Sequence, residues 1–137
     1  MAGFREHEHT ADWELEAWAD DLPGLLEQAA RGMYVLSGAR LQTGPRQQRR
    51  FQVQAEDLES LLVRFLSELL YFSQQEGLGF DYYQLALQDP AAGIVLQAQV
   101  EGAALASIDK EIKAVTYHNL VVRQAAGELR VRVVFDV

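Results

Sequence analysis

The segment 58–75 constrains the fold most, because its apolar residues recur at helical spacing and extend beyond a single stripe. Asp57 precedes it as an expected helix N-cap, and Gly77 follows it as an expected stop. The main stripe consists of Leu58, Leu61, Leu62, Phe65, Leu66, Leu69 and Leu70, and the apolar residues outside it are Val63, Tyr71 and Phe72. A helix that is apolar over more than one face needs cover on more than one side. We therefore expect this helix to lie inside the structure, as a layer between other elements.

A second helix is predicted over 22–36, with Asp21 as its N-cap, Pro23 in its first turn and Gly38 as its stop. The other patterned segments alternate between apolar and polar residues, as strands do. The predicted strands cover 4–7, 13–18, 49–55, 80–88, 94–100, 115–123 and 129–137. The poorly patterned segment 103–110 is predicted to be a loop. The last two strands are expected to form a hairpin across Ala125-Ala126-Gly127.

This order of elements suggests a β-α-β-β-α-β arrangement followed by further antiparallel strands. Strands that cluster after a helix favour an α+β fold over a wound parallel sheet. We predict one domain over residues 1–137, with two helices sandwiched between mainly antiparallel β-sheets. The positions expected to be buried are Leu26, Ala29, Leu62, Phe65, Leu66, Leu69 and Phe135.

The composition excludes several classes of protein. The chain has no cysteine, which rules out disulfides, thiolate zinc sites and cysteine nucleophiles. No stretch is apolar enough to span a membrane, and the N-terminal residues are too polar for a signal peptide, so we expect a cytoplasmic protein. The net charge of −8 argues against general nucleic-acid binding. An acidic protein is better suited to binding cations or to docking on a basic partner.

The final strand ends on an acid, because Asp136 lies one residue before the α-carboxylate of Val137. Two readings stay open from these residues alone. In the first reading the end of the chain has no function of its own, which is common because termini are disposable in most domains. Alternatively, the two carboxylates lie close enough together to hold a hard cation.

Other residues that could carry chemistry give weak signals when taken singly. The chain has no Gly-x-Ser-x-Gly elbow, no phosphate-binding Gly-rich loop and no dinucleotide fingerprint. His7 and His9 could place two imidazoles on one face of a strand for zinc, but surface histidines are the favoured reading. Asp12 is typical of a loop residue that caps its own backbone. Lys113 is by default a solvated lysine.

Taken together, five separated motifs give a specific pattern that resembles the archease family. They are His9-Thr10-Ala11-Asp12, Ala29-Ala30-Arg31-Gly32, Phe65-Leu66-Ser67-Glu68-Leu69-Leu70-Tyr71, Lys113-Ala114-Val115-Thr116-Tyr117-His118 and Val134-Phe135-Asp136-Val137. They occur in the family's order and cover the chain from end to end. The resemblance implies a non-enzymatic activator of the RtcB-type tRNA-splicing RNA ligase. Such an activator promotes guanylylation of the ligase and its multiple turnover.

The resemblance also implies a divalent-metal site formed by Asp12, Asp136 and the carboxylate of Val137. Oxygen ligands of this kind suit calcium, magnesium or manganese rather than zinc. By the same resemblance, His9 and Lys113 would lie near the partner or a nucleotide. Any encounter with GTP would occur through the ligase. Direct binding of nucleic acid is not expected. Two alternatives stay open: a general chaperone or modulator of RNA-modifying enzymes, and a metal-dependent hydrolase or nucleotidyl-transfer domain.

Overall fold

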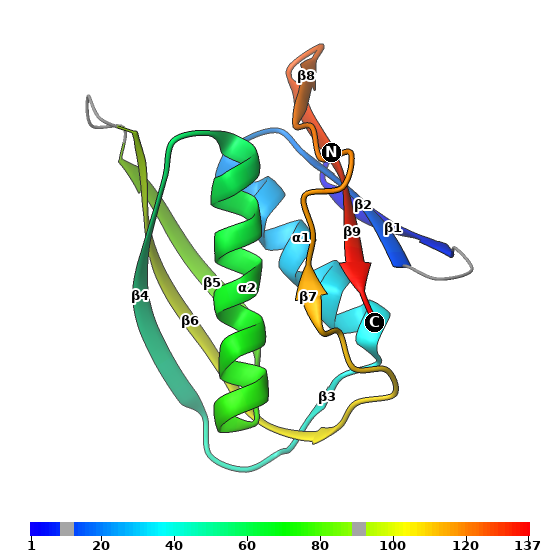
Figure 1. Ribbon diagram of the computed structural model, residues 1–137. Coiled ribbons are helices and arrows are strands. Elements are labelled where there is room, and N and C mark those ends of the chain that lie inside the picture. Colours follow the sequence, from blue (N-terminus) through cyan, green and yellow to red (C-terminus); the bar gives the residue numbers. More distant parts are fainter. Residues whose placement is uncertain (9–12, 89–92) are drawn as a thin grey trace.

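Two helices lie between two antiparallel sheets in the computed structural model, which describes residues 1–8, 13–88 and 93–137 (Figure 1). The helices are α1 (Leu22–Ser37) and α2 (Leu58–Glu76). The first sheet has the order β1-β2-β9-β7, and β8 also pairs with β9. In the second sheet β6 pairs with β3, β4 and β5. This arrangement confirms the predicted α+β class.

The strands of the first sheet are β1 (Gly3–Glu8), β2 (Trp13–Ala19), β7 (Ala114–Val115), β8 (Arg123–Ala125) and β9 (Glu128–Asp136). The strands of the second sheet are β3 (Arg40–Leu41), β4 (Gln47–Ala55), β5 (Leu78–Gln88) and β6 (Ile94–Ser107). The predicted β-α-β-β-α-β run is present from β2 to β5, with β1 preceding it and the remaining strands following it. No helix in the described parts of the chain is long and apolar enough to cross a membrane.

Both helices begin and end where the sequence predicts, to within one residue. The side chain of Asp21 accepts a hydrogen bond from the Gly24 amide at 2.8 Å, and that of Asp57 accepts one from the Ser60 amide at 2.7 Å. Gly38 and Gly77 both adopt φ 66°, the left-handed conformation that a glycine tolerates best at a helix end. Local capping chemistry therefore sets the length of each helix.

The core fills the space between each helix and both sheets. Helix α2 contacts β4, β5, β6 and β7, and α1 contacts β1, β2, β9 and β5. Every residue predicted to be buried is at most 1% exposed: Leu26, Ala29, Leu62, Phe65, Leu66, Leu69 and Phe135. The ring of Phe65 stacks on that of Phe51 in β4, with centroids 6.2 Å apart. The prediction of a central helical layer is confirmed.

The predicted loop over 103–110 is wrong in its first half, because β6 continues to Ser107. The reason lies at Gly102, which interrupts the apolar pattern of the sequence. A Cβ atom at this position would collide with the carbonyl oxygen of Gly79 in β5. The glycine therefore permits a close approach of two strands, next to an irregularity in the β5–β6 register at Phe80 and Tyr82.

The predicted strand over 115–123 is also wrong, since only its two ends pair with β9. Strand β7 ends at Val115, and β8 begins at Arg123. Between them, the Thr116 hydroxyl donates to the Val134 carbonyl at 2.9 Å. The backbone then turns through Asn119, whose φ is 50°. This left-handed residue is incompatible with a continuous strand, so a loop separates β7 from β8. The hairpin predicted across 125–127 is confirmed, because Ala125 in β8 pairs with Glu128 in β9.

The central position of α2 can be tested by truncating its buried aromatic residue. Phe65→Ala is expected to lower the free energy of unfolding by about 3–5 kcal/mol, because it leaves a cavity between the helix and β4. Tyr71→Ala is the matched control, since Tyr71 lies on the same helix and is 54% exposed. The control should lower the free energy of unfolding by about 0.5 kcal/mol or less, far less than the core variant does. Urea denaturation of both variants measures the difference, and equal losses would contradict the sandwiched position.

Candidate functional site: the end of strand β9

The end of β9 lies between two other strands of the first sheet, as Figure 1 shows for β2 and β7. Trp13 at the start of β2 pairs with Phe135, and Ala114 in β7 pairs with Asp136. The backbone amide of Lys113 donates a hydrogen bond of 2.7 Å to the Asp136 carbonyl. Val137 is half-buried and packs against the core. The last residues are therefore held by pairing and by apolar contact.

The alternation of β9 directs its acid outward. Phe135 is fully buried, and the neighbouring Asp136 is exposed. The Asp136 carboxylate makes no hydrogen bond or ion pair with any residue that the structure describes. A carboxylate without an internal partner is available to a cation from solution. Lys113, which the sequence singled out from a separate segment, is exposed at the same edge.

The structure brings only part of the predicted site together. Lys113, Asp136 and Val137 meet at one edge, whereas His9 and Asp12 lie outside the described residues. Within 1–8, 13–88 and 93–137, no group of three histidine, aspartate or glutamate side chains is close enough to hold a metal ion. The chemistry of the visible donors fits a hard cation, since both are carboxylates.

The outer face of the first sheet also carries an ionic network that the sequence analysis missed. Glu16 is only 6% exposed, although it is charged. Arg130 donates to Glu16 at 3.0 Å, and Arg5 does so at 3.4 Å. Both guanidinium groups also lie over the ring of Trp18, at 4.7 and 5.4 Å from its centroid. Hydrogen bonds to Glu16 and Glu128 raise the pKa of Arg130 above its ordinary value.

A hollow of about 250 Å³ lies beside this network. It is lined by Glu16, Asn119, Val121, Arg123, Arg130, Val131 and Arg132. The set holds three guanidinium groups against one carboxylate, in a chain whose net charge is −8. The alternation of β9 places Arg130 and Arg132 on one face, and the hairpin across 125–127 brings Arg123 opposite Arg130.

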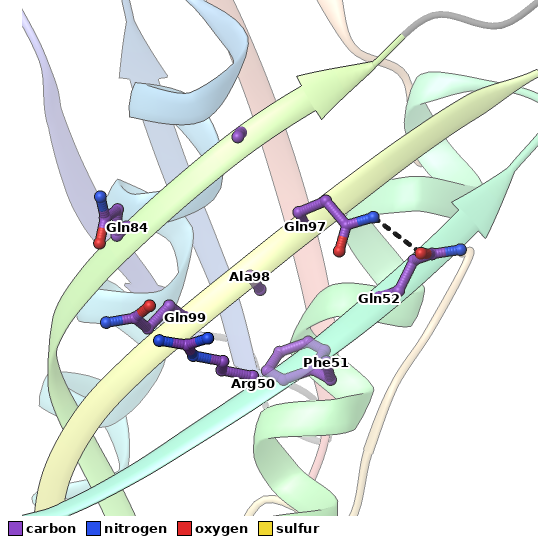
Figure 2. A pocket seen from close by; sticks show the side chains of 8 residues that line it. Arg50, Phe51, Gln52, Gln84, Gln97, Ala98 and Gln99 are labelled. Atoms are coloured by element: carbon purple, nitrogen blue, oxygen red, sulfur yellow. Dashed lines mark hydrogen bonds between the residues drawn. The ribbon is translucent and has the colours of Figure 1, made fainter.

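The second sheet has a different outer surface, with a hollow of about 510 Å³ over β4, β5 and β6 (Figure 2). Its polar lining is almost entirely amide. The residues are Arg50, Phe51, Gln52, Gln84, Ala86, Gln97, Ala98 and Gln99. Gln97 donates to Gln52 at 2.7 Å, as the dashed line in Figure 2 marks. Amides can donate and accept hydrogen bonds but do not transfer protons near neutral pH, so this surface is suited to recognition rather than catalysis.

Comparisons with known proteins agree with the fold and with each other. Residues 4–137 match the family model described as "Archease protein family (MTH1598/TM1083)". A protein archease of Thermococcus gammatolerans is 32% identical over 124 residues, which are 88% of this chain and 87% of the relative.

Two solved structures resemble the chain over nearly its whole length. One is the solution structure of Methanobacterium thermoautotrophicum protein 1598, with a TM-score of 0.80 and 27% identity, covering 98% of this chain and 99% of that one. The other is the crystal structure of an archease from Thermotoga maritima, described as a possible chaperone. Its TM-score is 0.69 at 22% identity, covering 97% of this chain and 96% of that one, a likeness that concerns the fold alone.

Proposed function

The chain belongs to the archease family, and from this premise we propose that it activates an RNA ligase of the RtcB type. The observation that carries the proposal is the family match over residues 4–137, which includes the final strand and its exposed acid. In this role the protein promotes guanylylation of the ligase and repeated turnover, and the GTP for that step is bound by the ligase. The protein itself ligates no RNA.

We further propose that a divalent cation binds Asp12, Asp136 and the carboxylate of Val137. Asp12 is covalently bonded to Trp13, and Trp13 pairs with Phe135, the residue before Asp136. The described chain therefore enters β2 beside the end of β9, which supports this choice of ligands. Calcium, magnesium and manganese all accept such a set of oxygen ligands.

The neighbouring polar residues support a role in positioning. Lys113 lies on the other side of β9, where its ammonium group can balance excess negative charge or contact a phosphate. His9 belongs to the same motif as Asp12, and we place it near the partner or its nucleotide. An acidic edge that carries a cation is complementary to the basic active site of an RNA-binding enzyme. The proposed task is to help align nucleotide, metal and nucleophile there.

The two hollows on the outer faces of the sheets do not resemble the active site of an enzyme that works through a covalent intermediate. The two hollows described above are lined by arginines, amides, apolar residues and a single carboxylate. This set lacks a nucleophile beside a general base, which acyl or phosphoryl transfer through a covalent intermediate requires. Steady turnover of RNA or nucleotide by the isolated protein would instead favour a metal-dependent enzyme.

A general chaperone is the second candidate, because the Thermotoga maritima structure of the same fold is described as a possible chaperone. The two roles differ in their dependence on the ligase. Suppression of aggregation of several unrelated clients, unaffected by changes at Asp136, would favour the chaperone. Stimulation restricted to the ligase favours the activator.

The metal site is tested by extending the chain. A C-terminal tag converts the Val137 carboxylate into a peptide and is expected to weaken calcium or manganese binding by about ten-fold or more, because one of three anionic ligands is lost. The same tag at the N-terminus is the matched control and should leave affinity unchanged. Isothermal titration calorimetry measures both proteins. Equal affinity in the two tagged forms would remove Val137 from the site.

The activation is tested by single substitutions at the acidic edge. Asp12→Ala and Asp136→Ala are each expected to abolish stimulation of ligase guanylylation over many turnovers. Thermal unfolding should stay cooperative, because Asp136 is exposed and makes no bond to other described side chains. Lys113→Ala should reduce stimulation with a smaller effect on metal affinity.

Glu56→Ala provides the control, since it removes an exposed acid between β4 and α2 and should stimulate normally. Full stimulation by Asp136→Ala would contradict the proposed role of the acidic edge. Stimulation lost equally in the Glu56 variant would show that overall negative charge, rather than this site, is responsible.

A further inference from the structure

The arginines around the 250 Å³ hollow are brought together by strand register rather than by sequence. Arg123 in β8 lies directly opposite Arg130 in β9, and Arg132 follows two residues later on the same face. Like charges directly opposite each other in a sheet are destabilising. The cost is reduced where carboxylates pair with the arginines, so the partners of each guanidinium group decide how much positive charge is left over.

Carboxylates compensate the positive charge of Arg130 fully, but the charges of the neighbouring Arg123 and Arg132 incompletely. Arg130 donates to Glu16 and to Glu128, each at 3.0 Å, and it also packs on Trp18. Among the described residues, Arg132 bonds only to Glu14, at the longer distance of 3.4 Å. Arg123 is exposed and makes no hydrogen bond or ion pair within the part of the chain that the structure describes. The hollow therefore has positive charge that no anion in residues 1–8, 13–88 and 93–137 fully neutralises.

The hollow is also partly organised before any ligand arrives. Glu16 lines it, but its two carboxylate oxygens already accept bonds from Arg5 and Arg130. Arg130 is thereby held in place as one wall. Asn119, with φ 50°, brings an amide group to the rim, and Val121 provides an apolar edge. A volume of about 250 Å³ is below that of sites for drug-sized molecules and suits a small anionic group.

We propose that this hollow binds a phosphate group, with Arg123 and Arg132 as the available cations and Arg130 as the fixed wall. Guanidinium groups match phosphate oxygens in charge and in fork geometry. The chain as a whole is acidic, so an extended polyanion is repelled by the remaining surface. The ligand is therefore a short group, carried by a free nucleotide or by the end of an RNA strand. This site is separate from the activation proposed above and does not depend on it.

The test uses the full chain and pyrophosphate as the probe, followed by calorimetry at low and moderate salt. Pyrophosphate is expected to bind once per chain and to raise the melting temperature. Arg123→Gln and Arg132→Gln should each weaken binding by about ten-fold, since each removes one charge-assisted contact. Arg50→Gln is the matched control, because Arg50 is an exposed arginine on the outer face of the other sheet. Its affinity for pyrophosphate should equal that of the parent.

A second arm distinguishes the two sources of phosphate. A nucleoside triphosphate and a 5′-phosphorylated RNA of about ten nucleotides are each titrated against the parent and Arg123→Gln. The ligand whose affinity falls in the variant identifies the source, and either result supports the site. The proposal is overturned if pyrophosphate does not bind the parent, or if Arg123→Gln and Arg50→Gln bind it as tightly as the parent does.

Discussion

The structure depends on one constraint: both helices bury more than one face, so neither can lie on the surface of a single sheet. Phe65 of α2 stacks on Phe51 of the second sheet, while the same helix also contacts β7 of the first. Helix α1 likewise contacts β2 and β5, which belong to different sheets. Hydrophobic burial on two sides couples the sheets through the helices. The position of the first sheet, and with it the end of β9, is thereby determined by packing across the whole molecule.

Strand β9 connects that packing to the outer face of the first sheet, where the candidate site residues lie. It is central in its sheet, and its inward residues Val131, Val133 and Phe135 are at most 2% exposed. Because side chains alternate along a strand, the same backbone presents Arg130, Arg132 and Asp136 on the outer face. The apolar contacts that hold Phe135 also hold the carboxylate beside it. A functional group next to a buried anchor has a defined position even at the end of a chain, where fraying is otherwise common.

The features that the sequence predicted are those set by local chemistry. The limits of α1 and α2 follow from Asp caps and Gly stops, and the burial of Phe65 follows from helical spacing. The features that it missed depend on contacts between distant segments. Gly102 continues a strand only because the backbone of Gly79 passes close to it, and Glu16 is buried only because Arg5 and Arg130 cover it. For the site, alternation predicted the outward direction of Asp136, whereas the position of Lys113 beside it required the tertiary structure. The roles of His9 and Asp12 stay predictions.

The outer face of β9 separates opposite charges along one strand. Arg132 and Asp136 are four positions apart, so their Cα atoms are separated by about 13 Å at the rise of a β-strand. That distance exceeds the Debye length of about 8 Å at physiological ionic strength, so exposed charges at the two positions are largely screened from each other. Val134 between them carries no charge, and the Arg132 guanidinium group bonds to Glu14, the residue paired with Val134. The acid at the end of the strand therefore does not neutralise the arginines. One strand in this way carries the proposed cation-binding edge at its end and the proposed phosphate-binding hollow beside its middle.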